Sequence, residues 1–189
     1  MNIGEEICGE WLRHIKGCEF VQYNLKTTAV QGEIDVIGIN LAERTVYVCE
    51  VATHLITGLQ YADNVPRLLA KFRKDIDYAE QAFPDHRHVF MFWSPVVRNQ
   101  KAGSKNNQLS DVQEVAAVLE RERGVTLQTV INERFHEALT AMRAYAASQT
   151  RELDSAVMRY LQVEEHLAKH LAKTLPKAPR NEAATPHSA

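Results

Sequence analysis

Apolar side chains recur along the chain with two periods, one typical of helices and one of strands. In residues 3–15 they return every third or fourth position, which predicts an amphipathic helix that ends near Gly17. Residues 18–23 form a predicted short strand. Residues 33–39 and 45–53 are two further strand-like runs joined by a short polar turn. The first third of the chain therefore predicts a helix, a strand and a β-hairpin.

A second amphipathic pattern follows the hairpin. Asp63 or Asn64 is placed to cap a helix that carries Pro66 in its first turn and ends near Pro84. The continuous apolar run at residues 88–93 then predicts a buried strand.

The rest of the chain alternates polar segments with further periodic ones. It predicts a loop or flap at 97–108, a helix at 110–123 ended by Gly124, a strand at 125–131, and helices at 132–147 and 150–174. This order indicates an α/β fold with a mixed β-sheet flanked by helices. We expect a domain over residues 1–131, a helical C-terminal extension over 132–174, and a disordered, proline-containing tail over 175–189.

Composition narrows the class of protein. The chain has 189 residues, 45% hydrophobic and 24% charged, with a formal net charge of −2, which suits one globular domain. The three cysteines include no CxxC pair, so free thiols in a reducing cytoplasm are the simpler expectation. No signal peptide is expected, because residues 1–10 carry three glutamates and no basic region followed by an apolar stretch. No transmembrane segment is expected, because no apolar run approaches eighteen residues.

The charge is unevenly distributed along the chain. Residues 1–64 carry a net charge of −5, residues 65–105 carry +4, and residues 106–189 carry −1. The middle segment is therefore the expected surface for a polyanion such as DNA, with a merely solvated helix face as the alternative. Of its eight basic residues, those expected to face the polyanion are Arg67, Lys71, Arg73, Lys74, Arg98, Lys101 and Lys105.

Two carboxylates interrupt the apolar runs of the predicted hairpin. Asp35 lies between Ile34 and Val36, and Glu50 lies between Cys49 and Val51. Burying such groups costs several kcal/mol unless they are paired or bind a metal. If the two strands pair, both carboxylates project from one end of the sheet and suit a hard divalent cation such as Mg²⁺. The alternative is a structural role at a strand end.

These residues stand in a recognisable order. The stretch Gly32-Glu-Ile-Asp-Val-Ile-Gly38, followed by Val46-Tyr-Val-Cys-Glu-Val-Ala-Thr53, resembles the PD-(D/E)XK, or restriction-endonuclease-like, superfamily. It is most similar to the branch that contains Holliday-junction resolvases, and Gly4-Glu5 matches the start of that family's first helix. The resemblance covers about half of the chain and implies a DNA endonuclease of repair, recombination or defence that uses Mg²⁺ or Mn²⁺. Asp35 and Glu50 would then hold the metal, and Glu5 would assist.

One position departs from the family pattern. The family has a lysine two residues after the glutamate, where this chain has Ala52. Lys71 on the following helix is our first candidate to replace it. Lys74, His54 or the metal alone are alternatives. A nuclease-fold module that binds DNA or a partner protein without catalysis is the competing hypothesis, and a purely protein-binding subunit is the third.

The last predicted helix carries an apolar stripe along one face. Such a stripe usually packs on its own domain, but pairing with a second copy is a second expectation. A symmetric homodimer through this helix would suit cleavage of both strands of a duplex.

Overall fold

The computed structural model describes residues 2–26, 32–59, 63–100 and 107–174, and within them the chain folds around one five-stranded mixed sheet. The strands are β1 (Phe20–Lys26), β2 (Glu33–Asn40), β3 (Thr45–Val51), β4 (Arg87–Ser94) and β5 (Gln128–Ile131). They lie in the order β1-β2-β3-β4-β5, antiparallel from β1 to β3 and parallel from β3 to β5. The predicted α/β class with a mixed sheet is confirmed.

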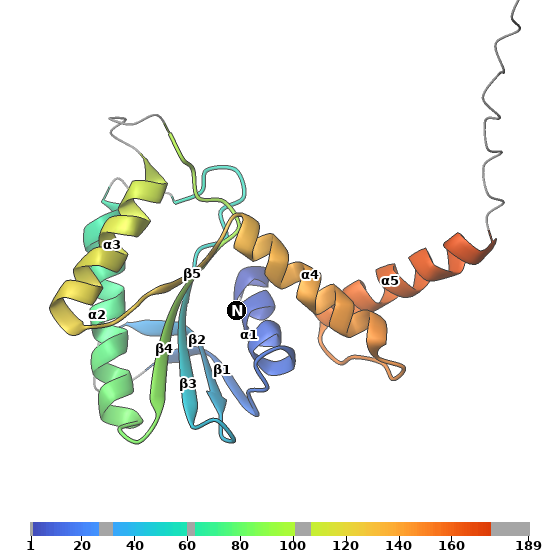
Figure 1. Cartoon of the computed structure of the whole chain (residues 1–189), viewed down its shortest axis with the longest axis horizontal. Helices are drawn as coiled ribbons and strands as arrows, with labels where there is room; N and C mark the ends of the chain where they lie inside the picture. The colour runs from blue at the N-terminus through green and yellow to red at the C-terminus, as the bar shows by residue number, and fades with distance from the viewer. Residues whose placement is uncertain (1, 27–31, 60–62, 101–106, 175–189) are drawn as a thin grey trace, which may run out of the picture.

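Helices cover both faces of this sheet (Figure 1). They are α1 (Ile3–His14), α2 (Asn64–Ala82), α3 (Gln108–Arg123), α4 (Glu133–Ser148) and α5 (Ala156–Thr174). On one face, α2 and α3 bury a core cluster centred on Phe72, Phe92 and Leu119. On the other face, α1 and α4 bury a second cluster around Leu12 and Trp93. The sheet is therefore the middle layer, and its central strands are buried on both sides.

The predicted hairpin is the β2–β3 pair. Val36 lies opposite Cys49 and Asn40 opposite Thr45, and the turn between the strands holds Arg44 at φ 49°. The β3 side chains are nearly all buried, because β4 runs parallel beside β3 and helices cover both faces. Any charged side chain on β3 is thereby removed from water.

Helix ends agree only in part with the predictions. Gly124 ends α3 in the left-handed conformation at φ 64°, as expected of a glycine C-cap. α3 begins at Gln108 rather than at the predicted residue 110, and its N-cap is Asn107, whose side chain accepts from the amide of Ser110. Asp63 occupies the N-cap position of α2 without a side-chain cap hydrogen bond.

The start of α5 lies at residue 156 rather than at the predicted 150. The Gln162 amide explains this difference, because its Nε2 donates to the carbonyls of Gln149 and Arg151 while its Oε1 accepts from the amide of Leu153. These bonds satisfy the backbone of residues 149–153 outside any helix. The apolar stripe alone could not reveal them.

Of the two C-terminal helices, α4 packs on the sheet and α5 packs on α4. Phe135 and Ala138 of α4 belong to the core on the α1 face of the sheet. Met158 and Leu161 of α5 pack on α4, and α5 then extends away from the sheet (Figure 1). The predicted tail lies outside the described residues, and the boundary after residue 131 stays a prediction. Within the described residues, no helix combines the length and apolarity needed to cross a membrane.

Candidate active site

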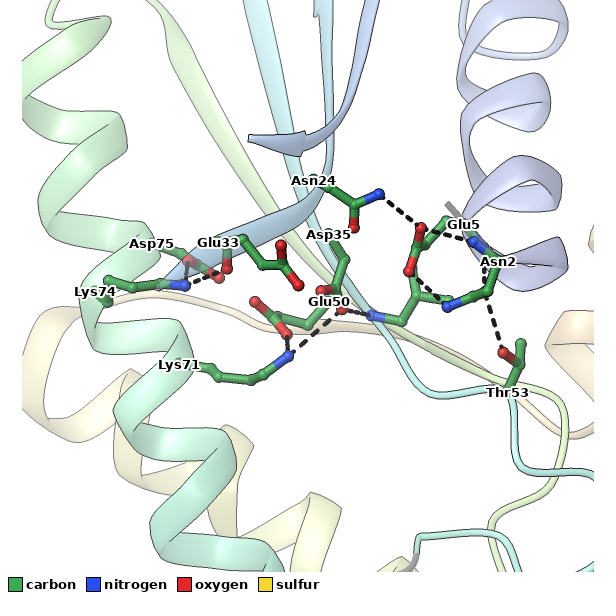
Figure 2. Close-up of polar contacts among 11 residues, drawn as sticks. Asn2, Glu5, Asn24, Glu33, Asp35, Glu50, Thr53, Lys71, Lys74 and Asp75 are labelled. Atoms are coloured by element: carbon green, nitrogen blue, oxygen red, sulfur yellow. Dashed lines mark hydrogen bonds and ion pairs between the residues drawn. The ribbon is translucent and has the colours of Figure 1, made fainter. Parts of the chain in front are cut away.

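Asp35 and Glu50 meet on the β2–β3 hairpin. Asp35 is 7% exposed and Glu50 is 1% exposed, so both carboxylates are withdrawn from water. Asp35 Oδ2 accepts a hydrogen bond of 2.8 Å from the backbone amide of Val51, which fixes its orientation toward β3. The two carboxylates that the sequence singled out therefore share one site at the end of β3 (Figure 2).

Lys71 reaches this site from α2. Its Nζ lies 3.5 Å from Asp35 Oδ2 and forms a hydrogen-bonded ion pair with Glu50 Oε2. The Lys71 side chain is 45% exposed, so its ammonium group lies between buried carboxylates and solvent. Of the proposed replacements for the lysine missing at Ala52, Lys71 is thus the one in contact with both acids (Figure 2).

The acids and the lysine change one another's ionisation. Burial raises the pKa of Glu50 well above its ordinary value, and the negative charges of Asp35 and Asp75 raise it further, although Lys71 opposes them. Burial also lowers the pKa of Lys71, but Glu50 and Asp35 more than compensate, and the pKa rises above its ordinary value. Lys71 therefore remains a cation at neutral pH and acts as a charge and hydrogen-bond donor rather than as a base.

A third acid, Asp75, was missed by the sequence predictions. It lies one helical turn after Lys71, is completely buried, and faces Glu50. Its Oδ1 lies 3.2 Å from the Nζ of Lys74, which also donates to the backbone carbonyl of Glu33. A signal was available, since Asp75 interrupts the apolar face of α2 between Phe72 and Ala79.

Glu5 has a structural role at the start of α1. Asn2 caps the helix by accepting from the amides of Gly4 and Glu5, and the Glu5 carboxylate accepts in return from the Asn2 amide at 2.9 Å. Asn24 on β1 also donates to Glu5 Oε2 at 3.1 Å. Glu5 lies beside the Asp35–Glu50 site, but these bonds direct its oxygens to Asn2 and Asn24 (Figure 2). Its assistance in catalysis stays a prediction.

The basic residues predicted to face DNA do not form one surface. Arg67 and Lys71 lie on the exposed part of α2 beside the acids. Arg73 instead pairs with Glu122 of α3, and Lys74 is only 12% exposed because it turns toward Asp75. Arg98 donates to the backbone carbonyl of Ile56. Lys101 and Lys105 lie outside the described residues.

A cavity of about 400 Å³ opens beside the acids. Its lining includes Glu50, Lys71 and Arg67 together with Ala52 and His54. The short side chain of Ala52 lines it at the position where the family pattern has a lysine. His54, another proposed replacement for that lysine, is exposed at the same cavity.

The oxygen donors fit a hard divalent cation. Glu50 Oε1 is buried and accepts no hydrogen bond within the described residues, and its neighbour Asp75 is a second carboxyl group. Carboxyl groups in such contact require a shared proton or a nearby cation, and in this structure Lys71 and Lys74 supply positive charge beside them. No group of three or more His, Cys, Asp or Glu side chains suited to a metal is present in the described part of the chain. Mg²⁺ is often held by one or two carboxylates, with water and phosphate completing its shell.

Comparison with protein families, with curated proteins and with solved structures finds no significant match to this chain. The function must therefore be argued from the site itself.

Proposed function

We propose that this protein is a metal-dependent endonuclease that hydrolyses phosphodiester bonds in DNA. The observation that carries the proposal is the contact of Lys71 with both Asp35 and Glu50 at the end of a buried hairpin. Two acids and one cation at a partly open cavity match the needs of phosphoryl transfer, in which positioning and charge stabilisation supply most of the catalysis.

Asp35 and Glu50 would hold the divalent cation, Mg²⁺ or Mn²⁺. When bound, such an ion neutralises phosphate charge and lowers the pKa of the attacking water. Glu50 Oε1 offers a free lone pair, and the Val51 amide keeps Asp35 Oδ2 in place. The chain thus supplies a preorganised pair of oxygen ligands without moving its backbone.

Lys71 would act on the phosphate and on the attacking water. Its side chain is exposed enough to shift from Glu50 toward a phosphate oxygen, and its raised pKa keeps it charged while it does so. Arg67, one turn earlier on α2, adds positive charge at the same cavity. The proton of the water must pass to another group, for which His54 is available.

A nuclease-fold module that binds DNA or a partner protein without cleaving DNA is the second candidate. Ala52 at the position where the pattern has lysine favours it, because a catalytic cation must then come from another element, such as Lys71 of α2. The two candidates make opposite predictions for turnover.

The apolar stripe of α5 supports the expected homodimer. Tyr160, Val163, Leu167 and Leu171 are between 41% and 66% exposed, and they are spaced by three or four residues as in paired helices. Glu164 and Glu165 pair with Arg143 of α4, so the apolar stripe rather than these acids is the surface that α5 offers to a partner. We therefore propose a second copy of this chain as the partner of α5.

The endonuclease proposal is tested by incubating the protein with supercoiled plasmid, branched DNA and single-stranded DNA. Each substrate is offered Mg²⁺, Mn²⁺ or a chelator, and Asp35→Ala is run in parallel. Cleavage that requires the metal and is lost in Asp35→Ala supports the enzyme. DNA binding with no cleavage of any substrate selects the non-catalytic module, and an absence of DNA binding contradicts the endonuclease and favours a role in protein binding.

A further inference from the structure

The cavity beside Glu50 has an apolar lining that hydrolysis of a phosphodiester bond does not require. Phosphate and metal need polar surroundings, yet Ala52, Leu59, Leu68 and Phe92 form an apolar lining behind the charged residues. Leu59, Leu68 and Phe92 are 7%, 8% and 1% exposed, so this lining belongs to the core of the sheet. At about 400 Å³ the cavity lies within the usual range for small-molecule sites.

The charges are at the side of the cavity where the acids lie. Lys71 and Arg67 lie one helical turn apart on α2 and both line it. A ligand that places an anion beside these cations and a flat apolar ring against the apolar lining would satisfy both parts of the cavity. A nucleotide unit has this combination, since every base offers an apolar face and carries a phosphate on its sugar.

Asn64 supplies a polar contact within the apolar part. Its Nδ2 donates to Asp111 at 2.7 Å, which fixes the amide, whereas its buried Oδ1 accepts no hydrogen bond within the described residues. Asn64 is 8% exposed and lines the cavity. A buried acceptor of this kind normally has a donor, and an amino group of a base is one.

An exposed apolar turn flanks the same cavity. Leu55 is 70% exposed and Ile56 is 85% exposed, immediately after the cavity residue His54. Their backbone is held in place, because Gln108 donates to the carbonyls of Thr57 and Leu59 and Arg98 donates to that of Ile56. Some DNA-binding proteins insert exposed apolar side chains of this kind between base steps and partly unstack them.

We propose that the cavity binds an unpaired nucleobase next to the phosphate at Lys71, and that Leu55 and Ile56 fill the gap which that base leaves in its stack. The proposal rests on the proposed function and deepens it. The substrate class becomes DNA with an unpaired or displaced base at the cleaved bond, rather than a fully stacked duplex.

The test is equilibrium binding of deoxyadenosine monophosphate without divalent metal, measured by saturation-transfer NMR. 2-Deoxyribose 5-phosphate, which lacks the base, is the comparison ligand. Ala52→Leu and Ala70→Leu each place a larger side chain in the cavity, from a loop and from α2, so one remains informative if the other fails to fold. Ala144→Leu, at an exposed position of α4, is the matched control, and Leu55→Ser/Ile56→Ser lies outside the cavity.

We expect the wild type to bind the nucleotide and not the sugar phosphate, and both cavity variants to bind it at least about fivefold more weakly, the low end for one stacked base. Ala144→Leu and Leu55→Ser/Ile56→Ser should bind it unchanged. Equal binding of the two ligands, unchanged affinity in folded cavity variants, or no signal at roughly 10 mM nucleotide would overturn the proposal. Nucleotide binding without DNA cleavage would support the base-binding cavity and contradict the endonuclease. DNA cleavage without nucleotide binding would support the endonuclease and contradict the base-binding cavity.

Discussion

At the scale of single residues, the site depends on one lysine that serves two buried acids. Lys71 lies within ion-pair distance of both Asp35 and Glu50 and keeps its charge because their charges raise its pKa. Its position explains how a chain with Ala52 would carry a charge at the cleaved phosphate. In the proposed endonuclease, Lys71 therefore supplies the positive charge nearest to both acids.

Lys71→Met should lower the rate constant of DNA cleavage at saturating enzyme by at least about 100-fold, as expected for removal of one preorganised charge. Binding of DNA should weaken far less, since Arg67 remains. Single-turnover cleavage and fluorescence anisotropy measure the two effects. Lys173→Met, an exposed lysine at the end of α5, should change neither. Full cleavage by Lys71→Met would assign the role to another group.

Glu50 should make stability depend on pH. Its pKa in the folded chain lies above the ordinary value of 4.5, so above about pH 4.5 the unfolded chain releases a proton that the folded chain still holds. The wild type therefore loses stability as pH rises through the folded pKa. Glu50→Gln lacks this titrating group. The free energy of unfolding of Glu50→Gln minus that of the wild type should therefore rise with pH, by at most about 1.4 kcal/mol per pH unit. Urea denaturation between about pH 5 and about pH 8 measures the difference, and a constant difference argues against the raised pKa.

At the scale of elements, the sequence predicts the hairpin and the helices, but it does not predict which residues of these elements contact one another. The strand-like apolar runs located β2, β3 and β4 to within two residues at each end, because these strands are buried. The burial of Lys74 and the approach of Asp75 to Glu50 depend on how α2 lies across the sheet. A periodicity identifies the buried face of a helix, but it does not identify the strand residues against which that face packs.

Gly4 shows how closely two elements meet at the site. A Cβ atom at Gly4 would collide with the Thr53 side chain just after β3, so only glycine lets α1 begin there. Gly4→Ala should reduce the free energy of unfolding by about 1–3 kcal/mol through overpacking. Thr53→Gly removes the obstructing atoms. In that background Gly4→Ala should therefore reduce the free energy of unfolding much less than it does in the wild type. Chemical denaturation of the four proteins measures the coupling, and simple additivity would exclude the collision.

At the scale of the whole molecule, the near-zero net charge is the sum of segments of opposite charge. Glu50 of the hairpin and Arg67 and Lys71 of α2 come from such segments, and the fold places them at one cavity. The C-terminal helices lie on the opposite side of the sheet from α2, where α5 leaves its apolar stripe exposed. The fold thus separates the proposed hydrolytic site from the proposed dimer surface.

The dimer makes a separate prediction. Leu167→Glu places a charge in the centre of the exposed stripe and should convert a dimer into a monomer, as measured by light scattering after gel filtration. Ala168→Glu adds the same charge one residue away and should stay dimeric. The thermal midpoint of the Leu167→Glu monomer reports whether its fold is retained. A wild-type protein that is already monomeric would remove the proposed role of the stripe.

The central claim is that Asp35, Glu50 and Lys71 form a hydrolytic site, and the cleavage rate of Glu50→Ala tests it most directly. The variant is compared with wild type on the best-cleaved DNA, at equal enzyme and Mg²⁺ concentrations, after both show the same circular dichroism. We predict metal-dependent cleavage by the wild type and a loss of at least about 100-fold in Glu50→Ala, because the metal would lose one of its two protein ligands. Cleavage at the wild-type rate by a folded Glu50→Ala protein would contradict the account.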